Sequence, residues 1–144
     1  MADAQLTLRV ITPEKILLDE PVQSVSLTAL DGSMGILPRH ANMVAALDVG
    51  VLEYRDPSGT VTPMFVGGGF AEVRDNTVRV VAPVGEQAEQ IDEERVAAAE
   101  QRARERLDRV HAAGGGADID LIRAQAALRR ALARERVVRR RRRS

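Results

Sequence analysis

The residue types that most often carry chemistry are scarce in this chain and do not form a recognisable catalytic or metal site. Its 144 residues include no cysteine and two histidines, His40 and His111, which have no metal-ligand spacing. No Gly-x-Ser-x-Gly sequence marks a nucleophile. The glycines at 67–69 lie between two expected strands rather than before a helix, so they indicate a bulge or a close backbone approach and not a phosphate loop. These patterns favour a protein that is not an enzyme.

Arginines near the C-terminus are the residues best suited to bind a partner. Residues 1–83 carry 6 basic and 10 acidic side chains, residues 84–113 carry 5 and 8, and residues 114–144 carry 10 and 3. The last segment therefore has a net charge of +7 (10 minus 3), although the whole chain is neutral. It could bind nucleic acid, an anionic membrane or an acidic protein surface. Nucleic acid is the weakest of these, because only 2% of the residues are aromatic and no recognition motif is present.

The elements that must position these residues begin with short strands. Leu6, Leu8 and Val10 alternate with polar residues, which is the period of a strand with one buried face. Turn-forming residues at 54–60 and 75–76 predict two hairpins. Several short strands separated by turns predict an all-β sandwich or flattened barrel.

The second half of the chain has the period of helices. Apolar residues recur at helical spacing in two stripes, at 96–110 and 121–138, with Asp92 and Asp118 as the expected N-caps and a glycine-rich turn between them. Both stripes are narrow and rich in alanine. They favour two closely packed antiparallel helices that are held only weakly to their neighbour.

The sequence thus predicts a two-domain α+β protein, an all-β sandwich followed by an antiparallel helical hairpin. The expected boundaries are 1–83 for the β-domain, 84–90 for a linker, 91–138 for the hairpin and 139–144 for a solvated, disordered basic tail. There is no leader sequence and no apolar run long enough to span a bilayer, so we expect synthesis in the cytoplasm.

Three sequence motifs resemble the epsilon subunit of bacterial and chloroplast F-type ATP synthases. Residues 31–40 read DGSMGILPRH, residues 66–73 read VGGGFAEV, and an Ile-Asp-x-x-Arg sequence at 91–95 opens the first helix. The resemblance implies a non-catalytic rotor subunit of the central stalk, held by the gamma subunit and touching the polar loops of the membrane c-ring. It also implies a peripheral location on the cytoplasmic face of the bacterial plasma membrane, with membrane contact only through the complex and no contact with nucleic acid. The implied c-ring contact loop contains Gly32, Ser33, Met34, Gly35, Arg39 and His40.

The same resemblance gives the hairpin a regulatory role. When extended, it would inhibit ATP hydrolysis by contacting an acidic segment of the catalytic beta subunits through Arg129, Arg130, Arg134 and Arg136. When folded, it would bind ATP as a regulatory ligand, and no cofactor is required. The implied ATP-binding residues are Glu86, Ile91, Asp92, Arg95, Arg102, Arg130 and Arg134. From the residues alone, the same charged side chains serve equally well as a helix cap and as solvated helix charges. The sequence also departs from the family pattern at Val96, where that pattern has an alanine.

A second hypothesis comes from a different class of protein. The arginine tail would suit a stand-alone module that binds nucleic acid or membranes. Co-purification with a multi-subunit ATPase supports the first hypothesis, whereas tight binding by the isolated chain supports the second.

Overall fold

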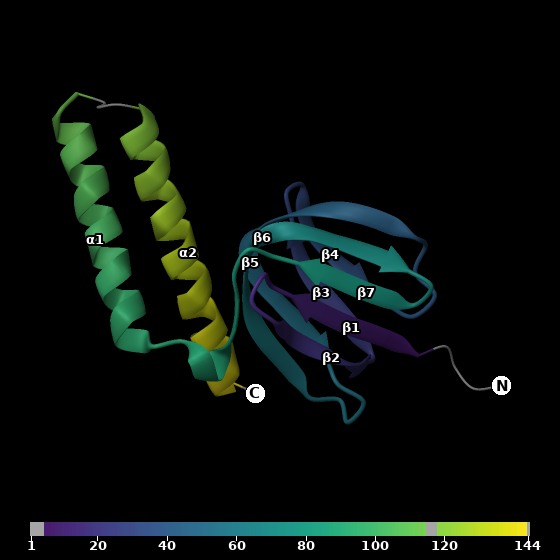
Figure 1. Cartoon of the computed structure of the whole chain (residues 1–144). Coiled ribbons are helices and arrows are strands. Elements are labelled where there is room, and N and C mark those ends of the chain that lie inside the picture. Colours follow the sequence, from purple (N-terminus) through teal and green to yellow (C-terminus); the bar gives the residue numbers. More distant parts are fainter. Residues whose placement is uncertain (1–4, 115–117, 144) are drawn as a thin grey trace.

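The computed structural model describes residues 5–114 and 118–143, which form a β-domain with a helical hairpin beside it (Figure 1). The strands are β1 (Leu6–Ile11), β2 (Ile16–Val22), β3 (Ser24–Ala29), β4 (Gly32–Ile36), β5 (Met43–Arg55), β6 (Val61–Arg74), β7 (Thr77–Val81) and β8 (Gly85–Gln87). A single 3-10 turn, η1 (Ala88–Gln90), leads to the helices α1 (Glu93–Ala112) and α2 (Asp118–Arg143).

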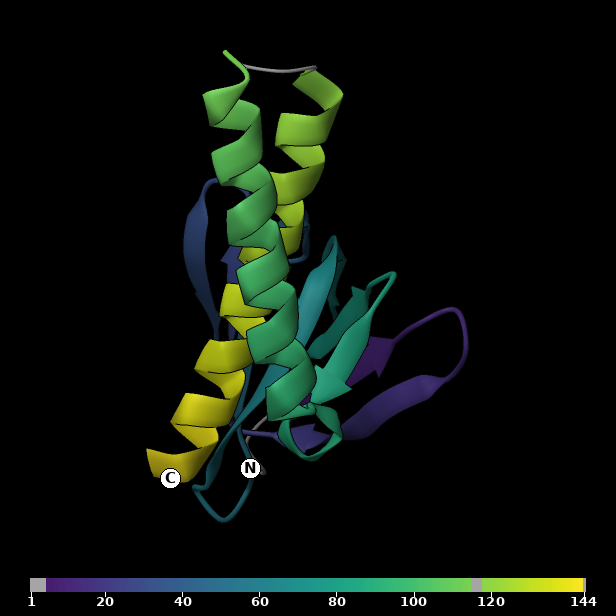
Figure 2. The ribbon, with the colours of Figure 1, turned by 90° about the vertical axis from the view of Figure 1, so that its left-hand side faces the viewer.

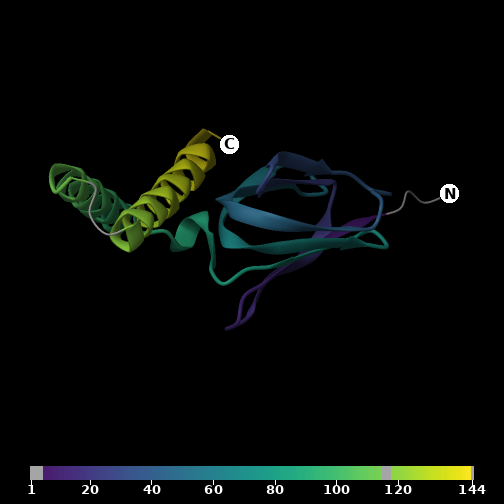
Figure 3. The ribbon, with the colours of Figure 1, turned by 90° about the horizontal axis from the view of Figure 1, so that it is seen from above.

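The strands form one open sheet that folds into the predicted sandwich. Its order is β2-β1-β7-β6-β5-β3-β4, with β8 added beside β6, and every pair is antiparallel except β1 with β7. The long strand β6 pairs with β8 through residues 64–66 and with β7 through residues 70–74. The sheet folds over itself, and its two layers are visible from above (Figure 3).

Alternating side chains of the strands fill the space between the layers. Leu6, Leu8 and Val10 of β1 and Val78 and Val80 of β7 are all fully buried. The prediction that the first strand has one buried face is confirmed.

Gly69 marks the close backbone approach that the glycine run indicated. Its φ is +94°, and a Cβ atom added there would lie 2.0 Å from the carbonyl oxygen of Val81. Only glycine tolerates both constraints, so this position permits the close approach of β6 to the backbone at the end of β7.

Both predicted hairpin turns are present. In the turn between β5 and β6, the Asp56 carboxylate accepts hydrogen bonds from the backbone N–H groups of Ser58 (2.9 Å) and Thr60 (3.0 Å). The hydrogen bond from the Ser58 hydroxyl lowers the pKa of Asp56. Asp75 and Asn76 adopt φ angles of 49° and 62°, as a two-residue hairpin turn requires.

The expected linker at 84–90 is instead part of the folded structure. Residues 85–87 form β8 along β6, and the N–H of Gly67 donates a hydrogen bond to the carbonyl of Val84 (2.8 Å). A Gly-Glu-Gln strand has no apolar alternation, and for that reason the sequence pattern did not reveal it. The chain therefore leaves the sheet after β8 and not at Pro83.

The two helices are antiparallel, and α2 lies between α1 and the sheet (Figures 1 and 2). Asp92 caps α1, because its Oδ1 accepts hydrogen bonds from the N–H groups of Glu94 (3.0 Å) and Arg95 (3.2 Å). Val96 and Ala103 are buried along the predicted stripe of α1, as are alanines on the facing side of α2. The capping role predicted for Asp118 concerns a side chain outside the described residues.

Helix α2 departs from the prediction in two respects. It has a second buried face, where Ala133 and Val137 pack with Val51 and Phe65 of the sheet. It also continues through Arg143, so the expected disordered tail is wrong. Arginine is a good helix former, and carboxylates of neighbouring elements balance its charge here. No helix in the described part of the chain is long and apolar enough to cross a membrane.

Candidate functional site

A cavity of about 360 Å³ lies where the start of α1 meets α2 and β8. Six of the seven residues implied for ATP binding line it, from four segments of the chain. They are Glu86, Ile91, Asp92, Arg95, Arg102 and Arg134. The structure thus brings together side chains that are up to 48 residues apart in the sequence.

Helix α1 supplies one wall of this cavity. Its cap, Asp92, fixes where the helix begins, and Arg95 and Arg102 follow seven residues apart, which places them on one face. Ala98 and Ala99 lie between the two arginines and leave the space open.

Helix α2 supplies Arg134, whose guanidinium is held by contacts with two residues of the β-domain. Its Nε donates a hydrogen bond to Oε1 of Glu86 (2.5 Å), and its guanidinium lies 4.4 Å from the ring centroid of the buried Phe65. Both members of the Arg134–Glu86 pair are about three-quarters buried. Stacking and pairing together keep the guanidinium in place.

The cavity carries an excess of positive charge. Glu86 is paired with Arg134, and Asp92 is engaged in capping. Within residues 5–114 and 118–143, no ion pair joins the side chain of Arg95 or Arg102 to a carboxylate. Two guanidinium groups are therefore available to an anionic ligand.

The positions of Val96 and Arg130 also bear on the implied ATP site. Val96 lines the cavity and is 9% exposed, because it also belongs to the buried apolar cluster that contains Ile91 and Ala131. Arg130 is exposed and does not line the cavity. It lies one turn nearer the hairpin tip than Arg134, and Ala131 occupies the cavity-facing position of that turn.

The arginines predicted to contact the beta subunits do not share one face. Arg129 pairs with Asp48 of β5 and Arg134 with Glu86, whereas Arg130 and Arg136 are exposed. Seven-residue spacing aligns Arg129 with Arg136, and four-residue spacing aligns Arg130 with Arg134. In this folded state, two of the four are thus already paired within the chain.

The residues implied for the c-ring contact include a strand and not only a loop. Gly32, Ser33, Met34 and Gly35 belong to β4, the edge strand of the sheet, because β4 pairs with β3 over its whole length. Arg39 follows in a turn with φ of 67°, and its N–H donates to Oδ1 of Asn76 (2.6 Å). His40 Nδ1 lies 2.9 Å from the carbonyl oxygen of Ala41. Leu30 and Leu37, at the two ends of β4, are both more than 60% exposed.

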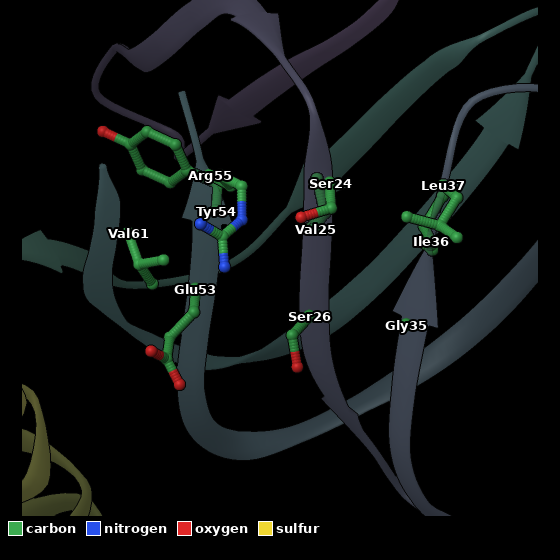
Figure 4. A pocket seen from close by; sticks show the side chains of 10 residues that line it. All are labelled: Ser24, Val25, Ser26, Gly35, Ile36, Leu37, Glu53, Tyr54, Arg55 and Val61. Carbon is green, nitrogen blue, oxygen red and sulfur yellow. The ribbon is translucent and has the colours of Figure 1, made fainter. Parts of the chain in front are cut away.

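A second cavity, of about 440 Å³, lies over β3, β4 and β5, and no residue pattern predicted it (Figure 4). Ser24, Ser26, Leu37 and Tyr54 are among its lining residues. Burial, and then the nearby Glu20 carboxylate, raise the pKa of Tyr54. The described residues contain no group of three or more potential metal ligands.

Sequence reasoning missed the carboxylates that receive the arginines of α2. They are Asp48, Glu53, Glu89 and Glu93. The only signal was the charge difference between the acidic first 113 residues and the basic remainder, which predicts attraction but not pairs.

Comparisons with known proteins agree on one family. The model of the ATP synthase delta/epsilon chain β-sandwich domain matches residues 5–88, and that of the long α-helix domain matches residues 89–139. The chain is 43% identical over 135 residues to the ATP synthase epsilon chain of Nitratidesulfovibrio vulgaris, covering 94% of this chain and 96% of that one. It is 48% identical over 136 residues to the epsilon chain of Symbiobacterium thermophilum, covering 93% and 91%.

Solved structures show the same similarity. A chain of the Euglena gracilis mitochondrial ATP synthase superposes with a TM-score of 0.80 at 26% identity, covering 96% of this chain and 84% of that chain. A chain of the Tetrahymena thermophila mitochondrial ATP synthase central stalk shares the fold, with a TM-score of 0.62 at 14% identity. On these matches, which span both domains, the chain belongs to the ATP synthase delta/epsilon chain family.

Proposed function

We propose that this chain is a central-stalk subunit of a bacterial F-type ATP synthase and that its hairpin inhibits ATP hydrolysis until ATP holds it folded. The family match supports the place in the complex. The cavity supports the nucleotide, because residues of β8, α1 and α2 converge there only when the hairpin is folded.

The chemistry of the cavity suits a nucleotide phosphate chain. Arg95 and Arg102 offer planar guanidinium groups that can bind phosphate oxygens through two hydrogen bonds each. The N-terminus of α1 adds positive partial charge at the same place. Glu86 and Asp92 supply carboxylate acceptors suited to the amino group of a base. A volume of about 360 Å³ lies within the usual range for a small-molecule site.

Ligand binding in this cavity would favour the folded hairpin. Ala131 and Arg134 of α2 form one wall, so separation of α2 from α1 and β8 removes the site. A ligand present at 100 times its dissociation constant that binds one state only stabilises that state by about 2.7 kcal/mol. This is enough to reverse a nearly balanced equilibrium.

Extension of the hairpin would release arginines for an acidic partner. Arg129 and Arg134 would leave Asp48 and Glu86 and join the exposed Arg130 and Arg136. We propose the acidic segment of the catalytic beta subunits as that partner. The β-domain would meanwhile contact gamma and the polar loops of the c-ring on the cytoplasmic face of the plasma membrane, through the exposed region of β4 and residues 37–40.

Calorimetric titration of the full chain with ATP tests the site. We expect saturable binding that Arg95→Ala weakens at least about tenfold, since a hydrogen bond to a charged group contributes roughly 1.5–3 kcal/mol. Arg106→Ala is the matched control, because Arg106 is an exposed arginine of α1 that does not line the cavity. No binding at millimolar ATP, or equal affinity of the two variants, would contradict the proposal.

The stand-alone binding module is not favoured by the structure. The arginines on which it relies are engaged within the chain: Arg140 with Glu53 and Arg142 with Glu93.

A further inference from the structure

Three consecutive arginines at the end of α2 pair with carboxylates on three different elements. Arg140 pairs with Glu53 of β5, Arg141 with Glu89 of η1 and Arg142 with Glu93 of α1. We call these six residues the arginine clasp. Successive residues of a helix point about 100° apart, so consecutive arginines spread around the helix and reach the sheet, the connecting turn and the first helix at once.

Each pair of the clasp is weak and exposed. The side chains of Arg140, Arg141 and Arg142 are 45%, 46% and 68% exposed. Nη2 of Arg142 donates to both carboxylate oxygens of Glu93, at 2.6 Å each. Salt weakens such exposed pairs progressively, because the Debye length falls from about 8 Å at physiological ionic strength to about 3 Å at about 1 M, which is close to the contact distance. The three pairs can act together because one rigid helix end carries all three arginines.

The apolar contact between α2 and the sheet is small by comparison. Ala133 and Val137 are the two fully buried side chains on the face of α2 that meets Val51 and Phe65. Small side chains bury little area, so electrostatic contacts have a large share in holding α2 on the sheet.

We propose that the arginine clasp is an electrostatic latch that holds the hairpin folded in the absence of ligand and opens as ionic strength rises. The regulatory meaning of the latch rests on the proposed function, because it sets the folded population on which ATP acts. The clasp itself lies outside the ATP-binding residues: none of its arginines lines that cavity.

A buried thiol at the interface of α2 with the sheet measures the opening. The chain has no cysteine, and Ala133 is 1% exposed, so a single Ala133→Cys thiol reacts with a reagent only when α2 lifts away. In this background, Arg140→Gln, Arg141→Gln and Arg142→Gln together should raise the labelling rate about tenfold at low salt, given roughly 0–1 kcal/mol for each exposed pair. The unmodified clasp should approach the same rate in about 1 M salt, where the Debye length is about 3 Å.

A matched triple variant separates the clasp from loss of charge as such. Arg136, Arg139 and Arg143 lie in the same two turns of α2 and are exposed. Arg139 pairs with Glu135 of its own helix, and none of the three has an ion pair to another element among the described residues. Their replacement by glutamine should change the rate less than about twofold.

Charge exchange gives the sharpest outcome. Arg140→Glu should speed labelling, and adding Glu53→Arg should slow it again. Equal effects of the two triple variants, no effect of salt, or no restoration by the exchange would overturn the latch. These experiments contain no nucleotide and no ATPase, so their failure is distinct from a failure of ATP binding.

Discussion

The β-domain and the hairpin of this protein are stabilised in different ways. The β-domain has fully buried leucines and valines and a glycine where only glycine fits. The hairpin has narrow alanine stripes, two small side chains against the sheet and a set of exposed ion pairs. The first kind of contact specifies one structure, whereas the second can be exchanged for other contacts at little free energy. This difference is what the proposed function requires, namely a fixed docking module joined to a movable regulator.

The largest expected effect comes from breaking the backbone approach in the β-domain. Gly69→Ala places a methyl group 2.0 Å from the Val81 carbonyl at a φ of +94°, so it should lower the free energy of unfolding by about 3–5 kcal/mol. Gly59→Ala is the control: its φ is +93°, but a Cβ there meets nothing within 4 Å, so it should lose only about 1 kcal/mol. Urea unfolding measures both. Equal losses would show that the close approach to Val81 is not what requires glycine at position 69.

Truncation at the boundary between the β-domain and the hairpin should have an intermediate effect on the free energy of unfolding. A chain that ends at Gln90 keeps β8 and should unfold cooperatively as an independent β-domain. A chain that ends at Pro83 loses β8 and the Gly67–Val84 hydrogen bond, and should be less stable by roughly 1–3 kcal/mol. Urea unfolding of the two truncated chains tests this. If both are equally stable, β8 belongs to the linker that the sequence predicted; if neither folds, the two-domain description is wrong.

A smaller effect is expected from solution conditions: the β-domain should respond to alkaline pH, and the docking of the hairpin should respond to salt. Burial, and then Glu20, raise the pKa of Tyr54 in the folded state, so the β-domain favours the neutral phenol. That contribution to stability is complete below about pH 10, the ordinary pKa of tyrosine, and is lost as the pH rises through the folded-state value. Unfolding of the β-domain at alkaline pH should therefore become easier, and Tyr54→Phe should lessen this dependence. Thiol labelling at Ala133→Cys should instead follow salt. A β-domain equally stable on both sides of pH 10 would contradict the assignment to Tyr54.

The sequence predicted the local features well and the long-range ones poorly. The cap at Asp92, the turn at Asp75 and Asn76 and the buried face of β1 each depend on neighbouring residues, and all are confirmed. The second face of α2 was missed because Ala133 and Val137 are interleaved with arginines.

Pairs across the fold were beyond sequence reasoning. Arg140 and Glu53 are 87 residues apart, and no spacing rule connects them. The residues of the cavity came from resemblance to a family. The exception, Arg130, shows that a one-turn offset on a helix decides whether a side chain reaches a site.

If the proposed function is right, ATP stabilises the docked hairpin without changing the β-domain. Thiol labelling tests it directly, with Ala133→Cys reporting on docking and Ala71→Cys, buried in β6, reporting on the β-domain. ATP at 100 times its dissociation constant should slow labelling at Ala133→Cys about a hundredfold and leave Ala71→Cys unchanged, and at the same ATP concentration the slowing should fall to about tenfold or less when Arg95→Ala is added. Unchanged labelling at Ala133→Cys with ATP bound, or equal slowing at both positions, would contradict the claim.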